Sequence, residues 1–401
     1  MKRWWQHPGV LGAAGLFLIT FPFLWLKLRY DYNSGNVTTV WGGDAALRFF
    51  RDLAPVAGSV LAVCLLRYWT PARAVFSKGW EWTCACGHNR LFTPMLMLGL
   101  VAVAPWLGPK YLTMGVFAGL FMIQALGLNI TVGMAGLLVL GYAGFYAFGA
   151  YAFAVGQILL PGLSWWMAAP VVFFLGGAIG WFVGLPCLRL RGDYLAIVTL
   201  GFAESFRELM RNLEITGGDK GISIDAASKI QPVGPASGPL VGYLLVLLVV
   251  ALSAWMVRRI YHSAIGRAWV AIREDETAAA CMGIPVVRMK LLAFALSAAF
   301  AALAGVLYAA FIGFVDPAAC SFDQSVMVLA MVILGGLGSI PGSLLGAAIL
   351  YLVPTLLRDQ LPALSEYRLL LFGIIMVAMM LLRPQGLLGS SRRAHEIKGE
   401  A

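Results

Sequence analysis

Long apolar segments alternate with short polar segments along nearly the whole chain. A helix needs roughly 20 apolar residues to cross the hydrocarbon core of a bilayer, so segments of this kind predict membrane-spanning helices. The pattern therefore predicts an all-α, polytopic transmembrane helix bundle with about 10 to 12 spans. The expected spans are residues 9–26, 53–69, 91–107, 111–128, 129–156, 165–185, 194–212, 239–257, 291–314, 322–337, 344–357 and 369–382.

The apolar pattern divides the chain into three expected regions. Residues 1–90 are expected to form an accessory pair of helices, and residues 91–390 the main transmembrane domain. The segment Gly9–Leu26 follows a basic start, but no small-residue cleavage site follows it cleanly, so we interpret it as an uncleaved span rather than a signal peptide. Residues 391–401 are expected to form a basic tail in the cytoplasm.

Composition supports the membrane interpretation. Hydrophobic residues make up 60% of the chain and charged residues only 12%, whereas soluble domains have roughly a quarter of their residues charged. The formal net charge of +10 comes mostly from lysines and arginines scattered through short loops. Because no compact basic domain is present in the sequence, we do not expect nucleic-acid binding.

The distribution of basic residues predicts the orientation of the spans. Alternating spans place Arg189, Arg191, the bases of residues 258–290 and the basic tail on one side. Cytoplasmic loops are enriched in lysine and arginine, so this side is expected to be the cytoplasm, together with both termini. Residues 27–52 are an exception, because they carry four bases on the expected outer side. The other expected outer loops hold few bases, namely Lys110, Lys220, Lys229 and Arg358.

Candidate chemistry is sparse. The motif CACGH at residues 84–88 superficially resembles a metal site, but its spacing is short and no second ligand pair follows. We interpret its cysteines as incidental thiols in a reducing compartment and expect no metal. No catalytic constellation is visible, and the sequence contains no G-x-x-x-x-G-K-[ST] loop to cradle a nucleotide. No cofactor is therefore expected in this chain, and ATP-driven transport would need a separate nucleotide-binding chain.

Residues 258–290 form a long polar segment between two strongly apolar ones. Asp275 is a suitable N-cap for a short helix, and Glu276 places negative charge in its first turn. Gly283 supplies a stop, and Pro285 prevents the helix from continuing. We expect a short capped helix that a cytoplasmic partner protein binds; a solvated loop helix without a partner is the alternative.

Two glycine-rich interruptions occur at membrane depth. In the first, Asn129 and Thr131 precede Gly133 and Gly136, and the second is the stretch Gly335–Gly342. Transporters often bind polar solutes at broken helices, where backbone groups are exposed, so the first interruption is a candidate translocation path. Close helix packing explains its glycines equally well. For the second interruption, a tight turn on the cytoplasmic side is the favoured interpretation.

The span at residues 193–212 is the most polar of the expected spans. Glu204 and Arg207 lie three residues apart, so they share a face and can pair. Glu204 lies about 16 Å along the helix from Asp193, near mid-depth, where a charge costs about 3 kcal/mol. We expect Glu204 to face the bundle interior, where it lines the translocation path or holds helices together. The structural role is the favoured interpretation.

A polar loop follows this span on the expected outer side. Thr216, Gly217, Gly218 and Asp219 combine a hydroxyl, a carboxylate and conformationally free glycines. Such a loop can form an outer mouth that contacts a solute or a docking protein. A plain surface loop without a partner is the alternative.

Five stretches carry the motifs of one transporter family. They are GLNITVGMAGLLVLGYAGFYAFGAYAFA at 127–154, LRLRGDYLAIVTLGFAESFRELMRNLEITGGDKGIS at 188–223, IGRAWVAIREDETAAACMGI at 265–284, MVILGGLGSIPGSLLGA at 331–347 and RPQGLLG at 383–389. With these motifs, the chain closely resembles the LivM-type permease subunits of bacterial branched-chain amino-acid ABC importers.

This resemblance implies the ABC importer permease fold and the transport of leucine, isoleucine and valine. It also implies that Glu276, Ala279 and Gly283, with Asp275 as the N-cap, form a coupling helix that docks on a cytoplasmic ATPase subunit. The implied partners are a sister permease subunit of the LivH type, two ABC ATPases that hold ATP and Mg²⁺, and a periplasmic amino-acid-binding protein. The implied location is the bacterial inner membrane.

Three alternatives stay open from the sequence. The same importer architecture could carry urea, short amides or other neutral amino acids, because substrate choice belongs largely to the binding protein. An ATPase-independent secondary transporter or channel is a different class, against which residues 258–290 and the sparse intramembrane charge both count. A membrane scaffold without transport gives the glycine-rich interruptions no role.

Overall fold

The computed structural model divides the chain into two compact units, Met1–Lys78 and Gly79–Ala401. The expected domain boundaries at residues 90 and 390 stay predictions. The structure describes residues 28–30, 37–39, 108–160, 162–187, 193–224 and 238–360, with Gly373, Gly386 and Leu387. Outside the described residues lie the expected spans 9–26, 53–69, 91–107 and most of 369–382, the bases Arg189 and Arg191, the CACGH motif and the basic tail.

The described part of the first unit is a short β-ladder. Strand β1 (Leu28–Tyr30) pairs antiparallel with strand β2 (Val37–Thr39), so that Leu28 lies opposite Thr39. The ladder falls within the polar segment at residues 27–52, which the apolar pattern placed between two spans. No strand was expected here, because the two strands have only three residues each and leave no clear period-two pattern.

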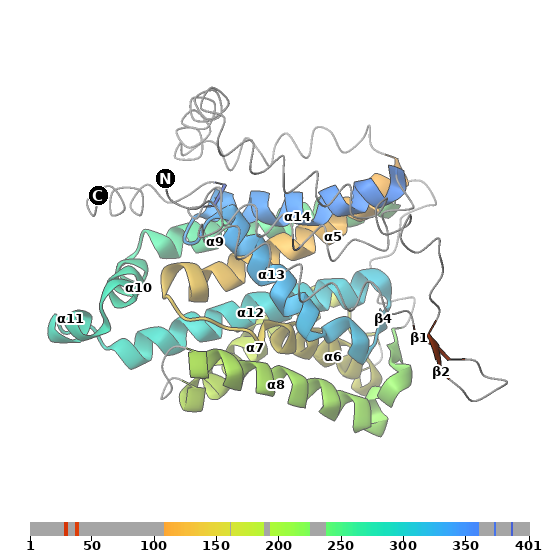
Figure 1. Ribbon diagram of the computed structural model, residues 1–401, viewed down its shortest axis with the longest axis horizontal. Helices are drawn as coiled ribbons and strands as arrows, with labels where there is room; N and C mark the ends of the chain where they lie inside the picture. The colour runs from red at the N-terminus through yellow and green to blue at the C-terminus, as the bar shows by residue number, and fades with distance from the viewer. Residues whose placement is uncertain are drawn as a thin grey trace. The chain divides into compact units, whose positions relative to one another are not determined.

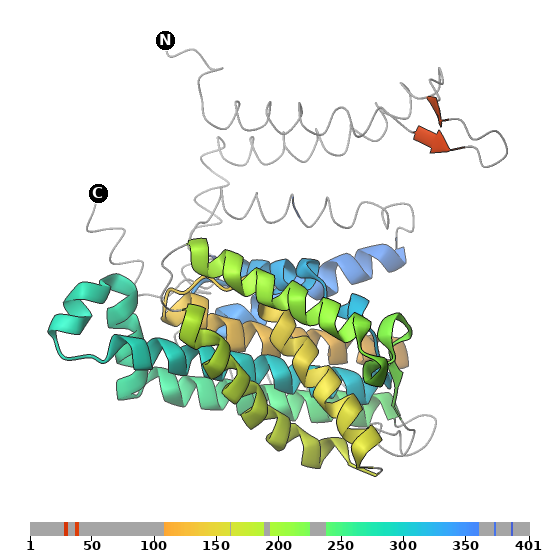
Figure 2. The ribbon, with the colours of Figure 1, turned by 90° about the horizontal axis from the view of Figure 1, so that it is seen from below.

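The second unit is a bundle of long helices (Figures 1 and 2), which confirms the expected polytopic helical fold. Among the described residues, four helical stretches are long and apolar enough to cross a membrane: Pro109–Met134, Trp165–Cys187, Leu240–Tyr261 and Val286–Ile312. The long helices are α5 (Pro109–Leu128), α6 (Tyr142–Leu159), α7 (Trp165–Cys187), α8 (Asp193–Asn212), α9 (Gly238–Tyr261), α12 (Val286–Ile312), α13 (Phe322–Gly335) and α14 (Ile340–Gln360).

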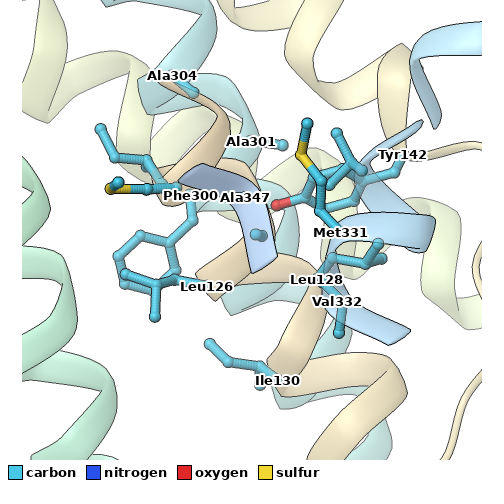
Figure 3. Packing of buried hydrophobic residues seen from close by; sticks show 14 of the residues in the cluster. Leu126, Leu128, Ile130, Tyr142, Phe300, Ala301, Ala304, Met331, Val332 and Ala347 are labelled. Carbon is cyan, nitrogen blue, oxygen red and sulfur yellow. The ribbon is translucent and has the colours of Figure 1, made fainter. Parts of the chain in front are cut away.

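Helix α12 forms the centre of this unit and packs against α5, α6 and α7. Phe300 of α12 is buried among apolar side chains of neighbouring helices (Figure 3). On α7, a Cβ atom at Gly176 or Gly180 would overlap Ala302 or Ala298 of α12. Small residues on both helices therefore let their backbones approach closely, which is the usual way in which membrane helices gain packing contacts.

The first glycine-rich interruption breaks a helix, but later than the apolar pattern indicated. The expected boundary between residues 128 and 129 is wrong, because α5 continues as the π-helical segment η3 (Asn129–Met134). Both residues at that boundary keep right-handed helical dihedral angles, so nothing ends the helix there. The chain leaves the helix near Gly136, whose φ is +71°, and α6 begins at Tyr142. Residues 135–141, which we call the link, are therefore a non-helical segment within the bundle.

The two ends of the second unit carry different structures. Helices α10 (Ala264–Glu274) and α11 (Glu276–Cys281) project together from one end (Figures 1 and 2). At the opposite end, strand β3 (Ile222–Ser223) pairs antiparallel with strand β4 (Phe314–Val315). Short 3-10 turns flank these strands: η4 (Glu214–Thr216), η5 (Gly218–Lys220) and η7 (Pro317–Cys320).

Helix α10 was not expected from the sequence, which indicated only the short capped helix in this region. The signal for it is the spacing of Ile265, Trp269 and Ile272, which lie four and three residues apart and so share one helical face. Trp269 and Ile272 are buried in the structure. The polar character of the surrounding residues masked this amphipathic pattern.

The close approach of α7 and α12 gives a test of the packing. We expect Gly176→Ala to lower the free energy of unfolding by about 1–3 kcal/mol, because its new methyl group would overlap the Cβ of Ala302. Gly177→Ala is the matched control, because its Cβ would meet Ala295 O at 3.5 Å and Ala299 Cβ at 3.6 Å, both ordinary contacts. Thermal unfolding of the purified chain in detergent measures both variants, and equal midpoints would contradict the packing.

Candidate functional site

Helix α11 is short and is capped at both ends as the sequence predicted. Asp275 Oδ1 accepts hydrogen bonds from the backbone N–H groups of Thr277 at 2.7 Å and Ala278 at 3.0 Å. At the other end, Gly283 has a φ of +80°, and its N–H donates to the carbonyl of Ala280 at 3.0 Å. A glycine in this left-handed conformation ends a helix without steric cost. Asp275 and Gly283 therefore fix the limits of the helix.

The faces of α11 differ in their surroundings. Ala279 is buried, with 4% of its surface exposed, whereas Met282 at the tip is 83% exposed. The carboxylate of Glu276 pairs with Lys290 of α12 at 2.6 Å, which connects the first turn of α11 to the start of the central helix. Apart from Ala279, the residues of α11 are exposed.

Helix α10 joins this short helix to the body of the unit. The indole nitrogen of Trp269 donates to the carbonyl of Met289 in α12 at 2.7 Å. The guanidinium Nη1 of Arg273 donates to the carbonyl of Gly133 at 2.8 Å, at the end of η3. Together, α10 and α11 form a projecting element that we call the lever, and it contacts both α12 and the broken helix.

The two glycine-rich interruptions lie against each other, although they are about 200 residues apart. Asn129 Oδ1 accepts from the N–H of Gly338 at 2.9 Å, and its Nδ2 donates to the carbonyl of Ser339 at 3.4 Å. A Cβ at Gly133 would overlap Asn129 Oδ1 and lie 2.5 Å from Gly338 N. The second interruption is a turn between α13 and α14, as expected. We call this meeting point of η3 and residues 336–339 the glycine junction.

The polar residues of the first interruption are largely committed to the bundle itself. Asn129, Thr131 and Gly133 are buried. The Thr131 hydroxyl donates to the carbonyl of Leu128 at 3.1 Å and lies 3.3 Å from the hydroxyl of Ser297. Gly136 is exposed. Their use as a translocation path stays a prediction; in this structure Asn129 and Gly133 pack in the glycine junction, and Thr131 lies beside Ser297 of α12.

The described end of the C-terminal RPQGLLG motif also reaches this region. Leu387 N donates to the carbonyl of Leu334 near the end of α13 at 2.8 Å. Gly386 has a φ of +78°, and a Cβ there would overlap Gly336. The motif therefore closes the C-terminal end of α13 beside the glycine junction.

Helix α8 has an exposed face that is apolar in its first half, at Tyr194, Ile197 and Val198, and polar in its second half. Glu204 Oε2 pairs with Arg207 Nη2 at 2.6 Å, which confirms the expected pairing, but 38% of the Glu204 side chain is exposed. Gly201, Ser205 and Glu208 are exposed on the same face. Within this chain, Glu204 is therefore half-exposed rather than enclosed by the bundle, and its recorded polar partner lies on its own helix.

The exposed face of α7 has a different character. It carries large apolar side chains, among them Trp166, Val171, Phe174 and Phe182. Such a face matches the hydrocarbon of a bilayer, whereas an ion pair at membrane depth is costly in lipid. The face of α7 therefore suits lipid, whereas the second half of α8 carries an ion pair that does not.

The expected outer mouth is an ordered turn at the end opposite to the lever. Thr216 is buried, and its hydroxyl donates to backbone carbonyls at the end of α8. Gly217 and Gly218 have φ values of +70° and +57°, which glycine adopts readily. Asp219 pairs with Arg211 at the surface. The Thr216 hydroxyl is thus occupied within the chain, and Asp219 is the carboxylate that the loop exposes.

Sequence reasoning missed several residues that build the site. Trp269, Arg273 and Lys290 fix the lever, and their partners could not be identified from spacing along the chain. Thr199 of α8 accepts from Leu140 N at 3.2 Å and so holds the link. Thr199 could have been noticed in the sequence because it is a polar residue within an apolar stretch of α8.

Comparison with known proteins identifies the family. The sequence model described as the branched-chain amino acid transport system permease component matches residues 111–380. The Escherichia coli K12 protein named high-affinity branched-chain amino acid transport system permease protein LivM is 41% identical over 433 aligned positions, covering 100% of this chain and 99% of that protein. The chain belongs to the branched-chain amino-acid permease family. It is a multi-pass membrane permease, as the sequence motifs indicated.

More distant relatives of the permease are named for other transport subunits. The Escherichia coli K12 permease protein LivH is 25% identical over 283 positions, covering 67% of this chain and 91% of that protein. The autoinducer 2 import system permease protein LsrC of Enterobacter sp. strain 638 is 29% identical over 287 positions, covering 69% and 81% of the two chains. No solved structure gives a significant match to the permease.

The N-cap of α11 gives a test of how the permease orders its lever. We expect Asp275→Ala to destabilise α11 by about 0.5–2 kcal/mol, because two backbone N–H groups lose their acceptor. Amide hydrogen exchange over residues 276–283 should then speed up. Asp275→Asn is the control, because asparagine caps helices about as well as aspartate. Equal exchange rates in Asp275→Ala and the parent chain would contradict the capping role.

Proposed function

We propose that this chain is the membrane-spanning permease subunit of an ATP-binding-cassette importer for leucine, isoleucine and valine. The observation that carries the proposal is the lever, a capped helix that projects from one end of the bundle and is tied to the broken helix at its base. The LivM relatives are named for high-affinity branched-chain amino acid transport, which supports this substrate class.

The proposal includes partner subunits that supply what this chain lacks. The sequence has no nucleotide-cradling glycine loop, so two cytoplasmic ATPase subunits would bind ATP and Mg²⁺. A sister permease of the LivH type would complete the membrane domain, and the resemblance of this chain to both LivM and LivH proteins supports a pair of related subunits. A periplasmic amino-acid-binding protein would deliver the solute at the end that carries the β3–β4 ladder.

This arrangement sets the orientation in the bacterial inner membrane. The lever would face the cytoplasm, where Glu276, Ala279 and Gly283 shape the surface that an ATPase subunit contacts. Both termini would lie on the same side, as the basic tail and the bases of residues 258–290 favour. Closure of the ATPase dimer would move the lever and shift the bundle between two conformations, each with different contacts to the solute.

We place the translocation path along the exposed face of α8. The Glu204–Arg207 pair lies near mid-helix, where contact with lipid would be costly, so a second protein surface or water must cover it. A sister permease packed on this face would enclose a polar channel between the two subunits. The apolar face of α7 would then contact lipid.

The coupling role of α11 can be tested by changing both of its ends. We expect the double variant Glu276→Lys with Gly283→Asp to abolish ATP-dependent leucine uptake while membrane insertion survives. The first change places like charge beside Lys290, and the second strains a left-handed residue by about 1–2 kcal/mol. Uptake by proteoliposomes of the complete transporter is the measurement. Glu276→Gln is the control and should retain most uptake, because glutamine keeps an oxygen that accepts from Lys290.

Normal uptake by the double variant would remove the coupling assignment. Loss of uptake together with loss of insertion would instead show that the two changes damage folding. Separate measurement of the amount of permease in the membrane distinguishes these outcomes.

We propose that Glu204 lines the path, whereas the sequence favoured a structural role for it. Because its recorded partner lies on its own helix, we expect Glu204→Ala to change the free energy of unfolding by about 1 kcal/mol or less. We expect leucine uptake or solute selectivity to change more strongly. Glu208→Ala is the control, because Glu208 is exposed on the same face and bonds Asn212 at the end of the helix. A severe loss of folded yield in Glu204→Ala with unchanged selectivity would restore the structural role.

A further inference from the structure

Arg273 occupies an unusual place between the lever and the bundle. Its side chain is only 18% exposed, although it carries a permanent charge. Nη1 donates to the carbonyl of Gly133 at 2.8 Å. Nε and Nη2 donate to Glu274 Oε1 at 3.1 Å and 2.6 Å, so the neighbouring carboxylate fixes the guanidinium plane. A planar fork of donors can make both sets of contacts at once.

The other side-chain hydrogen bonds from the lever to the bundle lead to the helix that follows it in the chain. Trp269 and Glu276 bond residues at the start of α12, and the backbone of the lever continues into that same helix. Among the hydrogen bonds described for α10 and α11, the one from Arg273 reaches back 140 residues, to η3. This hydrogen bond therefore connects the lever to a part of the bundle that is distant from it along the chain.

Arg273 also fits closely against both parts of the glycine junction. A Cβ at Gly136 would lie 2.7 Å from Arg273 Cγ, so the stem of the arginine passes over that glycine. A Cβ at Gly338 would lie 3.5 Å from Nη1. The side chain is thus seated between the start of the link and the α13–α14 turn, and glycine at these positions leaves room for it.

We propose that Arg273 is the tie through which movement of the lever reaches the glycine junction, which makes it a positioning residue for transport. The inference rests on the proposed function. Gly133 passes the displacement to Asn129, whose amide holds the α13–α14 turn. Gly136 passes it to the link, which Thr199 of α8 holds at Leu140. The same tie therefore leads to α8, the helix on which the proposed path lies.

Arg273→Met is the main test, because methionine keeps the apolar stem and removes every donor. The complete transporter in proteoliposomes, with its ATPases, sister permease and binding protein, gives leucine uptake and ATP hydrolysis on one sample. We expect leucine carried per ATP to fall about tenfold, within the range of coupling between distant sites, while basal ATP hydrolysis and subunit assembly persist. Arg267→Met is the matched control, because Arg267 lies on the same helix and donates locally to His262 O. It should leave the ratio unchanged.

A second measurement does not depend on the solute. Leu138→Cys places a thiol in the link, and its maleimide labelling is followed on the peptide that contains residue 138, with and without ATP. We expect ATP to change the labelling rate in the Leu138→Cys parent and in its combination with Arg267→Met, and to have no effect once Arg273→Met is added. If Arg273→Met fails to assemble, Arg273→Lys replaces it, because a lysine keeps the charge but cannot hold Gly133 and Glu274 with a fork. We expect the labelling change to be reduced there.

The outcomes separate this inference from the proposed function. The proposed role of Arg273 would be overturned if ATP still changed the labelling rate in Arg273→Met, or changed it in Arg273→Lys as strongly as in the Leu138→Cys parent. It would also be overturned if ATP had no effect on labelling in that parent. If the parent shows the change and Arg273 variants lose it while no leucine is carried, the tie stands and the proposed substrate fails.

Discussion

A backbone that leaves its helix inside a membrane must find hydrogen-bond partners in the protein, because lipid offers none. The second unit meets this constraint around the link at residues 135–141 with short polar side chains from separate helices. Thr199 accepts from the link at 3.2 Å, and Ser325 accepts from the first turn of α6 at 2.8 Å. Asn129 accepts from the α13–α14 turn at 2.9 Å. These three side chains satisfy part of the backbone freed around the helix break, and the backbone carbonyl of Thr131 accepts from Leu137 N.

The glycines near the link follow from the same constraint. A Cβ at Gly141 would overlap the backbone of Thr199, and one at Gly133 would overlap the amide of Asn129. A short polar side chain can reach a backbone group on another helix only if the two backbones approach closely, and glycine permits that approach. The sequence left open whether these glycines serve a helix break or close helix packing, and the two roles are therefore compatible. At this junction the packing is what makes the break possible.

The sequence alone predicted the features that depend on neighbours along the chain. Apolar periodicity located most of the described helices, and the local chemistry of Asp275 and Gly283 located the caps of α11. It could not predict contacts set by tertiary packing, such as that between Asn129 and Gly338, which lie 209 residues apart. It also placed a helix boundary before Asn129, because a π-helical extension has no apolar period of its own. The local pattern of α11 predicted a capped helix, and the proposed coupling role rests on the family motifs.

The lever and the bundle differ in how firmly they are packed, and this difference locates where the unit can change shape. Helix α11 has only six residues, too few to be stable alone, so its order depends on its caps and on Lys290. Helix α12, in contrast, is held by interdigitated small residues against α7, and a displacement there would open voids along the whole helix. The link and the α13–α14 turn are non-helical, and part of their backbone bonds the side chains of Thr199 and Asn129. Under the proposed function, a movement of the lever would therefore reach these two segments first, because Arg273 contacts both of them.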